Sequence, residues 1–273
     1  EHLKLVLTEK AFDVLNAFDK SFYTISSFDE EPYQKIMGCT LGKFSFPVDF
    51  LGVGKNGIVF LINHQGVNRA LKISEPAYLK DEFSGWEDEC KYAKKAGDAG
   101  LGPKVLECDT CGVIGNPRRR GYMLQEALDG LPLSKVDLSK DLIFRVLDSY
   151  ERLLNIGIIH RDVHAGNVMI LKKEPSIRWI DYGQVFDGRE ESDKIFYMAV
   201  YARDLREDLY YSEHGRPNYT HQLKYGDPDW VIEWIDSHRL YKEKFESLRV
   251  ADPEAFAIRE KVLKERERLK LPI

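Results

Sequence analysis

The sequence predicts an α+β fold, with strands concentrated in the first half of the chain and helices in the second. Residues 48–63 hold two apolar runs around a group of glycines, and an alternating run follows at 69–73. From 139 to 155, apolar residues recur at helical spacing, and candidate helices follow at 192–209, 228–235 and 253–270. At 273 residues, the chain is long enough for two lobes around a cleft.

Composition places the chain among ordinary globular proteins. It is 43% hydrophobic and 31% charged, with a net charge of -5. That charge gives no electrostatic reason to expect a nucleic acid partner, and no apolar run approaches the roughly 20 residues of a membrane helix. We therefore expect a cytoplasmic protein that binds neither nucleic acid nor a membrane. The chain begins at Glu1 without a methionine, which leaves a targeting segment upstream open.

The four cysteines include one pair with metal-like spacing, Cys108 and Cys111. Zinc prefers four ligands, and no nearby histidine completes a second pair. We therefore favour a strand-turn-strand with buried thiols in a reducing compartment. Residues 1–46 contain a short amphipathic pattern and many aromatic residues, so we expect them to pack on the rest of the chain as an extension.

Three glycines lie between the first two predicted strands. Gly52, Gly54 and Gly57 fit the pattern GxGxxG, in which backbone N–H groups can approach phosphates. A glycine-rich hairpin turn is the alternative. Because a strand and not a helix follows, the pattern differs from a dinucleotide-binding motif.

The strongest chemical signal lies between residues 155 and 183. His160, Arg161 and Asp162 precede Asn167, and Asp181 begins the sequence Asp-Tyr-Gly. Asp162 can orient a hydroxyl and accept its proton, while Asn167 and Asp181 can hold a Mg²⁺ ion that bridges nucleotide phosphates. Each residue alone would more often belong to a turn.

The glycine run, Lys72, HRDxxxxN and DxG, in this order, resemble the protein-kinase superfamily over residues 47–186. The resemblance implies a bilobal fold. Residues 47–128 would form a small β-rich lobe with one key helix, and residues 129–273 a reduced, mainly helical lobe. The N-terminal extension would precede them.

The resemblance also assigns residues to ATP. Lys72 would hold the α- and β-phosphates and would need a carboxylate partner from the following helix. A capping box at 84–87 would start that helix near Gly85 and use Glu87, which makes Glu89 the better partner; Glu82 and Glu87 stay open. The remaining nucleotide contacts would come from Gly52, Gly54, Gly57, Val59, Ala70, Gln125 and the backbone near Glu126 and Leu128.

The catalytic loop departs from the usual protein-kinase pattern. His164 stands where a lysine is usual, and no APE sequence follows Gly183. The loop is similar to that of haspin-type kinases, and its D-x-H-x-G-N core also resembles aminoglycoside and choline phosphotransferases. We expect activity without phosphorylation of an activation loop. The compact C-terminal lobe is similar to minimal kinases that pathogens deliver into host cells.

The resemblance implies an ATP- and Mg²⁺-dependent kinase that transfers the γ-phosphoryl group to a hydroxyl, with a protein serine or threonine as the preferred acceptor. Catalysis is assigned to Asp162, Lys72, Glu89, His160, Arg161 and His164, and metal binding to Asn167 and Asp181. The alternatives are a small-molecule kinase, a non-catalytic nucleotide-binding scaffold, and transfer of AMP.

Overall fold

The computed structural model describes residues 40, 43–44, 47–54, 57–74, 85–113, 116–173, 176–188, 190–212, 223 and 226–251. The expectations for residues 1–39 and 253–270 lie outside this part of the chain. The chain divides into two compact units. Unit 1 takes the described residues up to Leu131, with His160–Asp162 and Met169–Phe186; unit 2 takes Pro132–Ile159, Val163–Val168 and the described residues from Asp187 onward.

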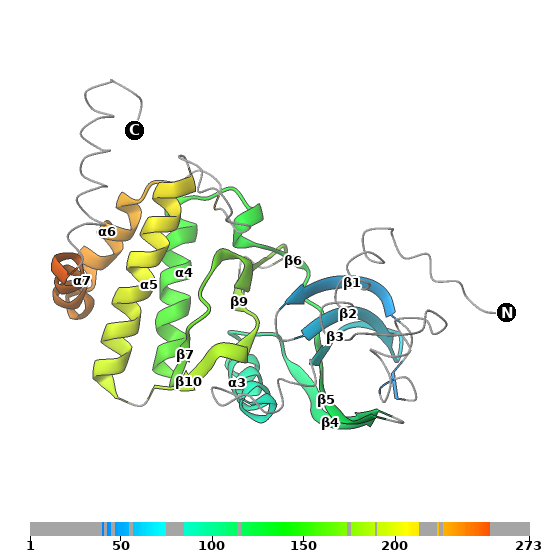
Figure 1. Cartoon of the computed structure of the whole chain (residues 1–273). Helices are drawn as coiled ribbons and strands as arrows, with labels where there is room; N and C mark the ends of the chain where they lie inside the picture. Colours follow the sequence, from blue (N-terminus) through cyan, green and yellow to red (C-terminus); the bar gives the residue numbers. More distant parts are fainter. Residues whose placement is uncertain are drawn as a thin grey trace. The chain divides into compact units, whose positions relative to one another are not determined.

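Unit 1 is built on a five-stranded antiparallel sheet with the order β1-β2-β3-β5-β4 (Figure 1). The mixture of this sheet with helices confirms the predicted α+β class. The strands are β1 (Pro47–Gly54), β2 (Gly57–His64), β3 (Val67–Ser74), β4 (Val105–Val113) and β5 (Asn116–Glu126).

The sheet has two chemically different faces, because successive side chains of a strand alternate between faces. One face is apolar and almost fully buried. The ring of Phe44 packs on it, with its centroid 5.5 Å from that of His64 and 5.6 Å from that of Tyr122. The opposite face carries Lys72. The apolar face includes Ile58, Phe60, Ile62, Leu71 and Ile73.

One helix, α3 (Trp86–Asp98), packs with the sheet in unit 1. Its buried residues recur at intervals of three and four, as expected of an amphipathic helix. The predicted capping box is wrong in register: Gly85 is the N-cap and makes no side-chain cap hydrogen bond. Glu87 is therefore an exposed residue of the first turn. The buried residues are Trp86, Glu89, Tyr92, Ala93 and Ala96.

Unit 2 is mainly helical, and its helices α4 and α5 lie side by side (Figure 1). The predicted cap of α4 is confirmed, since Ser139 Oγ accepts a hydrogen bond from the Leu142 amide at 3.2 Å. The predicted helices at 192–209 and 228–235 are also present, with ends that differ by a few residues. The helices are α4 (Lys140–Asn155), α5 (Glu191–Ser212), α6 (Asp229–Ser237) and α7 (Arg239–Ala251).

Short elements carry the residues of the predicted catalytic loop and of the Asp-Tyr-Gly segment. They form two small sheets, with the orders β6-β8-β9 and β10-β7. Their bounds are β6 (Gly130–Pro132), η3 (Leu133–Lys135), β7 (Ile158–His160), η4 (Ala165–Asn167), β8 (Val168–Leu171), β9 (Ile177–Trp179), η5 (Tyr182–Gln184) and β10 (Val185–Asp187).

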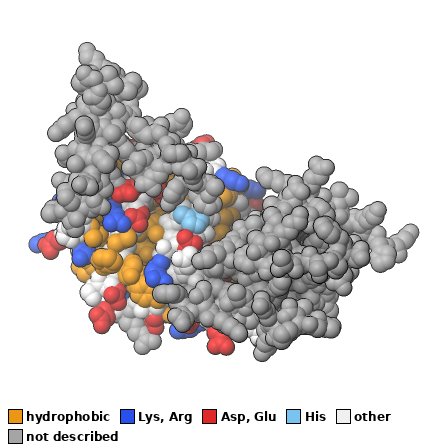
Figure 2. Space-filling view, viewed as in Figure 1, with side chains coloured by type: hydrophobic (Ala, Val, Ile, Leu, Met, Phe, Trp, Pro, Cys, Tyr) orange, Lys and Arg blue, Asp and Glu red, His pale blue; other side chains and the backbone are white. Residues whose placement is uncertain are grey.

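The surface of unit 2 mixes apolar and charged side chains. On the face seen in Figure 2, hydrophobic side chains gather over α4 and α5, with charged side chains around them. Phe196 of α5 is 37% exposed, and the Lys244 ammonium of α7 lies 5.2 Å from its ring centroid. Among the described helices, none combines the length and the apolar character needed to cross a membrane.

Candidate active site

Three charged residues that are far apart in the sequence meet in unit 1. Lys72 Nζ of β3 lies 2.5 Å from Glu89 Oε1 of α3 and 2.8 Å from Asp181 Oδ1, which directly precedes η5. The side chains of Lys72 and Glu89 are only 9% and 2% exposed, whereas that of Asp181 is 34% exposed. We call these three residues the Lys72 cluster.

The electrostatics of the Lys72 cluster favour its charged form. Burial opposes the charge of Lys72, but the carboxylates of Asp181 and Glu89 outweigh burial and raise the pKa of the ammonium. The same ammonium lowers the pKa of the Asp181 carboxyl, with a smaller contribution from His160. At neutral pH the cluster therefore presents a fixed ammonium and a partly exposed carboxylate.

The backbone at Asp181 is held in an unusual conformation. Its φ of 63° and ψ of 75° lie in the left-handed region, where residues other than glycine are uncommon. The adjacent segment is fastened by His160, whose Nε2 lies 3.0 Å from the Ile180 carbonyl oxygen, and by Tyr182, whose hydroxyl donates to the Trp179 carbonyl at 3.0 Å. Such strain persists where packing over-determines it, which is common at functional sites.

The register of the sheet brings further predicted nucleotide contacts onto the face of Lys72. Val59 lies directly opposite both Lys72 and Gly52, and Ala70 lies opposite Gln125. Directly opposed residues share a face. A Cβ atom added at Gly52 would meet nothing within 4 Å, so that position is open.

The other two glycines of the run belong to the turn between β1 and β2. Gly54 pairs with Gly57 across the turn, and residues 55–56 lie outside the described part of the chain. A Cβ atom at Gly57 would lie 2.4 Å from the Ile73 carbonyl oxygen. Gly57 is therefore required for close packing on β3, which agrees with the hairpin interpretation and does not depend on a nucleotide.

The predicted adenine contacts lie at the end of β5. The Glu126 amide donates to the Lys104 carbonyl at 2.9 Å, so this N–H group already has a hydrogen-bond partner. Leu128 follows the end of β5 and is half-buried. Backbone pairing with adenine would therefore use the Glu126 carbonyl or the groups of Leu128.

In unit 1, Arg161 and Asp162 follow β7 directly. The Arg161 guanidinium carbon lies 5.3 Å from the centroid of the Phe186 ring, and the Arg161 amide donates to the Gln184 carbonyl at 3.1 Å. Arg161 is exposed and Asp162 is half-buried. The arginine thus has an aromatic partner.

In unit 2, His164 shapes the turn that carries Asn167. His164 Nδ1 accepts a hydrogen bond from the Gly166 amide at 3.1 Å and so caps η4. Asn167 is 6% exposed at the end of that turn. The contact gives His164 a local structural role, and its catalytic role stays a prediction.

The expectation of free thiols at Cys108 is wrong. Cys108 forms a disulfide with Cys90, and β4 runs continuously through 108–111, so no turn lies there. Cys108 and Cys111 stood out because they are close in sequence, whereas the bonded cysteines are 18 residues apart. No local pattern in the sequence pairs Cys90 with Cys108.

A second polar group lies in unit 2. Asp148, Glu151 and His238 place potential metal-ligand atoms within 4.8 Å of one another. The carboxylates already accept hydrogen bonds from aromatic donors, Trp234 Nε1 to Asp148 at 2.7 Å and Tyr241 OH to Glu151 at 2.6 Å. We interpret this group as a structural network.

Comparison with known protein families and curated proteins gives no match in sequence. No protein-family model matches the chain, and no curated protein matches it. Among solved structures, the chain is similar to the PknI kinase domain of Mycobacterium tuberculosis, with 19% identity over 58% of this chain and 73% of that chain, and a TM-score of 0.42. A likeness at this level says nothing about what this chain binds or does.

Proposed function

We propose that the chain is an ATP- and Mg²⁺-dependent phosphotransferase that moves the γ-phosphoryl group to a hydroxyl. The observation that carries the proposal is the Lys72 cluster, a buried ammonium held between two carboxylates. Burying charges is costly, and replacing a buried ion pair by apolar residues is often neutral or stabilising. Perturbed, buried charges concentrate at functional sites.

Each member of the cluster has chemistry that suits a nucleotide. Glu89 fixes the Lys72 ammonium, which can then hold phosphate oxygens. The partly exposed Asp181 carboxylate is a hard oxygen ligand of the kind that Mg²⁺ prefers. Asn167 is proposed as a second ligand from the sequence resemblance alone. When bound, the metal ion would neutralise phosphate charge. Asp162 would orient the acceptor hydroxyl and accept its proton.

The acceptor is proposed from the sequence resemblance. The intact His160-Arg161-Asp162 run and the haspin-like loop favour a protein serine or threonine. The histidine at 164 and the missing APE segment favour a small molecule. We place the protein acceptor first, and the small molecule becomes an outcome of the test.

The test follows the fate of each phosphate. Wild-type protein and the Asp162→Asn variant are incubated with ATP labelled at the γ- or the α-phosphate, first with generic protein acceptors and then with a panel of small hydroxyl compounds. The matched control is Asp141→Asn, which removes an exposed carboxylate on α4. We expect γ-label in protein, lost by about a thousandfold in Asp162→Asn and retained in the control.

The other outcomes separate the alternatives. Transfer of γ-label to a small molecule alone would replace the proposed acceptor. Label from the α-phosphate would indicate transfer of AMP and overturn the reaction. Binding of ATP with no transfer would favour the non-catalytic scaffold.

A further inference from the structure

The disulfide between Cys90 and Cys108 joins α3 to β4 with a Cα–Cα distance of 5.9 Å. Cys90 directly follows Glu89, the residue that holds Lys72. Two consecutive residues of α3 are therefore linked to the sheet, Glu89 to β3 by an ion pair and Cys90 to β4 by a covalent bond.

The sheet register shows that both links reach the same face. Met123 of β5 lies opposite Lys72 on one side and opposite Cys108 on the other. Lys72 and Cys108 therefore point to the face on which α3 packs. A change in the Cys90–Cys108 link would act on the helix turn that carries Glu89.

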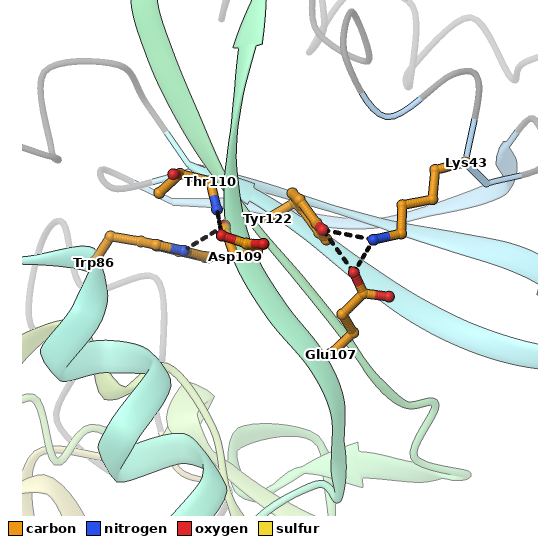
Figure 3. A network of polar contacts seen from close by, with 6 residues as sticks. All are labelled: Lys43, Trp86, Glu107, Asp109, Thr110 and Tyr122. Atoms are coloured by element: carbon orange, nitrogen blue, oxygen red, sulfur yellow. Dashed lines mark hydrogen bonds and ion pairs between the residues drawn. The ribbon is translucent and has the colours of Figure 1, made fainter.

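A second contact fastens the first residue of α3 to the same strand. The Trp86 indole N–H donates to the Asp109 carbonyl at 3.0 Å, and Figure 3 shows this side chain reaching β4 from the start of the helix. A Cβ atom at Gly121 would lie 2.2 Å from the Trp86 ring, so the ring packs directly on the β5 backbone. This contact would keep α3 attached when the disulfide is open.

The face of β4 that points away from α3 is also held in place. Glu107 binds Lys43, and the Tyr122 hydroxyl donates to Glu107 at 2.6 Å and accepts from Lys43 at 2.8 Å (Figure 3). The anchor for Cys108 is therefore a strand fastened on both faces. Opening the disulfide would release the middle of α3 and leave β4 in place.

We propose that the Cys90–Cys108 pair is a redox-dependent positioning device for Glu89, an inference that rests on the proposed function. With the disulfide formed, Glu89 stays against Lys72 and transfer is fast. With the disulfide opened, α3 moves more freely and transfer slows. Both cysteines are half-buried, so a reductant can approach them.

The opening step is a thiol–disulfide exchange with a dithiol reductant. One thiolate of the reductant attacks a sulfur of the pair and forms a mixed disulfide, which its second thiol then resolves. Two electrons and two protons pass to Cys90 and Cys108, and the reductant leaves as a disulfide. Because disulfides persist in oxidising surroundings and open in reducing ones, the activity would follow the redox state of the surroundings.

The test compares three forms of the whole chain: oxidised wild type, wild type reduced by dithiothreitol, and the Cys90→Ser/Cys108→Ser double variant. Intact mass and peptide mapping follow the Cys90–Cys108 link, hydrogen exchange follows the amides of α3, and single-turnover assays follow transfer from γ-labelled ATP. On reduction we expect about tenfold faster exchange in α3 and about tenfold slower transfer. The double variant should match reduced wild type in both redox conditions.

A role through Glu89 is separated from general stabilisation by repeating the assay with Glu89→Gln. We expect reduction still to speed exchange in α3 but no longer to change the residual transfer rate. Unchanged exchange or unchanged transfer on reduction of the wild type would overturn the inference, as would absence of the Cys90–Cys108 link in the oxidised protein. If no redox state transfers label, the proposed function fails, while the exchange comparison still decides whether the disulfide positions α3.

Discussion

The two units bury polar groups in different ways. In unit 1, the Lys72 cluster places a full ammonium and the Glu89 carboxylate almost entirely out of solvent. In unit 2, Asp148 and Glu151 of α4 stay at least partly exposed and accept hydrogen bonds from Trp234 and Tyr241. Among the described residues of unit 2, no lysine is buried, whereas unit 1 buries Lys72.

This difference indicates which polar groups exist for stability alone. A hydrogen bond from an aromatic N–H or O–H to a carboxylate stabilises a helix pair at little desolvation cost. A buried ion pair is weak evidence for stability, because its desolvation can exceed the gain from pairing. We therefore expect substitutions in the Lys72 cluster to remove activity, and substitutions in the unit 2 network to change stability alone.

The largest effect is expected for Lys72→Met. The substitution leaves Glu89 and Asp181 without the ammonium between them, so phosphoryl transfer should fall by about a thousandfold or more, with a loss of about 3–5 kcal/mol in the free energy of unfolding. The control is Lys140→Met, whose exposed partner is Glu233; it should change stability by less than about 1 kcal/mol and leave transfer unchanged. Single-turnover assays and urea unfolding measure both quantities. Equal loss of transfer in the two variants would contradict the comparison.

The next effect is expected for Glu89→Gln. The amide keeps the shape of the side chain but not its charge, so Lys72 is held less firmly, and transfer should fall by about 10- to 100-fold. Glu87→Gln, at an exposed position on the same helix, is the matched control. Steady-state assays with ATP compare the variants. A larger loss in Glu87→Gln would show that the partner of Lys72 in solution is not the one in the structure.

The pH dependence of stability gives a smaller, directional effect. Lys72 lowers the pKa of the Asp181 carboxyl in the folded protein. The contribution of Asp181 to folding stability is therefore present above its pKa in the unfolded chain, about 4, and is lost as the pH falls through its lower pKa in the folded protein. The pKa of Lys72 is raised in the folded protein. The contribution of Lys72 to folding stability is therefore present throughout the neutral range and is lost only above its pKa in the unfolded chain, about 10.4. As the pH is lowered from 7 to 2, the melting temperature should fall less steeply for Asp181→Asn than for wild type. Parallel curves would exclude the coupling.

The smallest effect is expected in unit 2. Trp234→Phe keeps the stacking ring, whose centroid lies 3.8 Å from that of His238, and removes the N–H donor to Asp148. Stability should fall by about 1–2 kcal/mol, with transfer unchanged in the folded protein. Urea unfolding and transfer assays at matched folded concentration measure the two. A loss of transfer comparable to that of Lys72→Met would remove the distinction between the units.

Much of the fold could be predicted from local patterns. Helical spacing identified α4 and α5, and Ser139 marked the start of α4, because capping and amphipathic periodicity are local properties. The start of α3 was misplaced, since Ser84 offered a cap signal in the sequence while the helix begins one residue later, after Gly85. Such boundaries depend on tertiary packing as much as on caps.

The parts of the site that depend on spacing along the sequence could be predicted. The parts that depend on how distant elements pack against one another were less predictable. The pairing of Lys72 with Glu89 was the preferred choice among three glutamates, but only the rotation of α3 against β3 selects it. The contact of Asp181 with Lys72 and the disulfide of Cys90 with Cys108 were not predicted. Both join residues that only the tertiary fold brings together, and no local pattern encodes them.

The most direct test of the central claim measures single-turnover transfer from γ-labelled ATP by wild type, Lys72→Met and Trp234→Phe, each at the same folded concentration. We expect rapid transfer by wild type and Trp234→Phe, and a rate about a thousandfold lower for Lys72→Met. A Lys72→Met rate equal to that of wild type would contradict the assignment of the buried cluster to phosphoryl transfer.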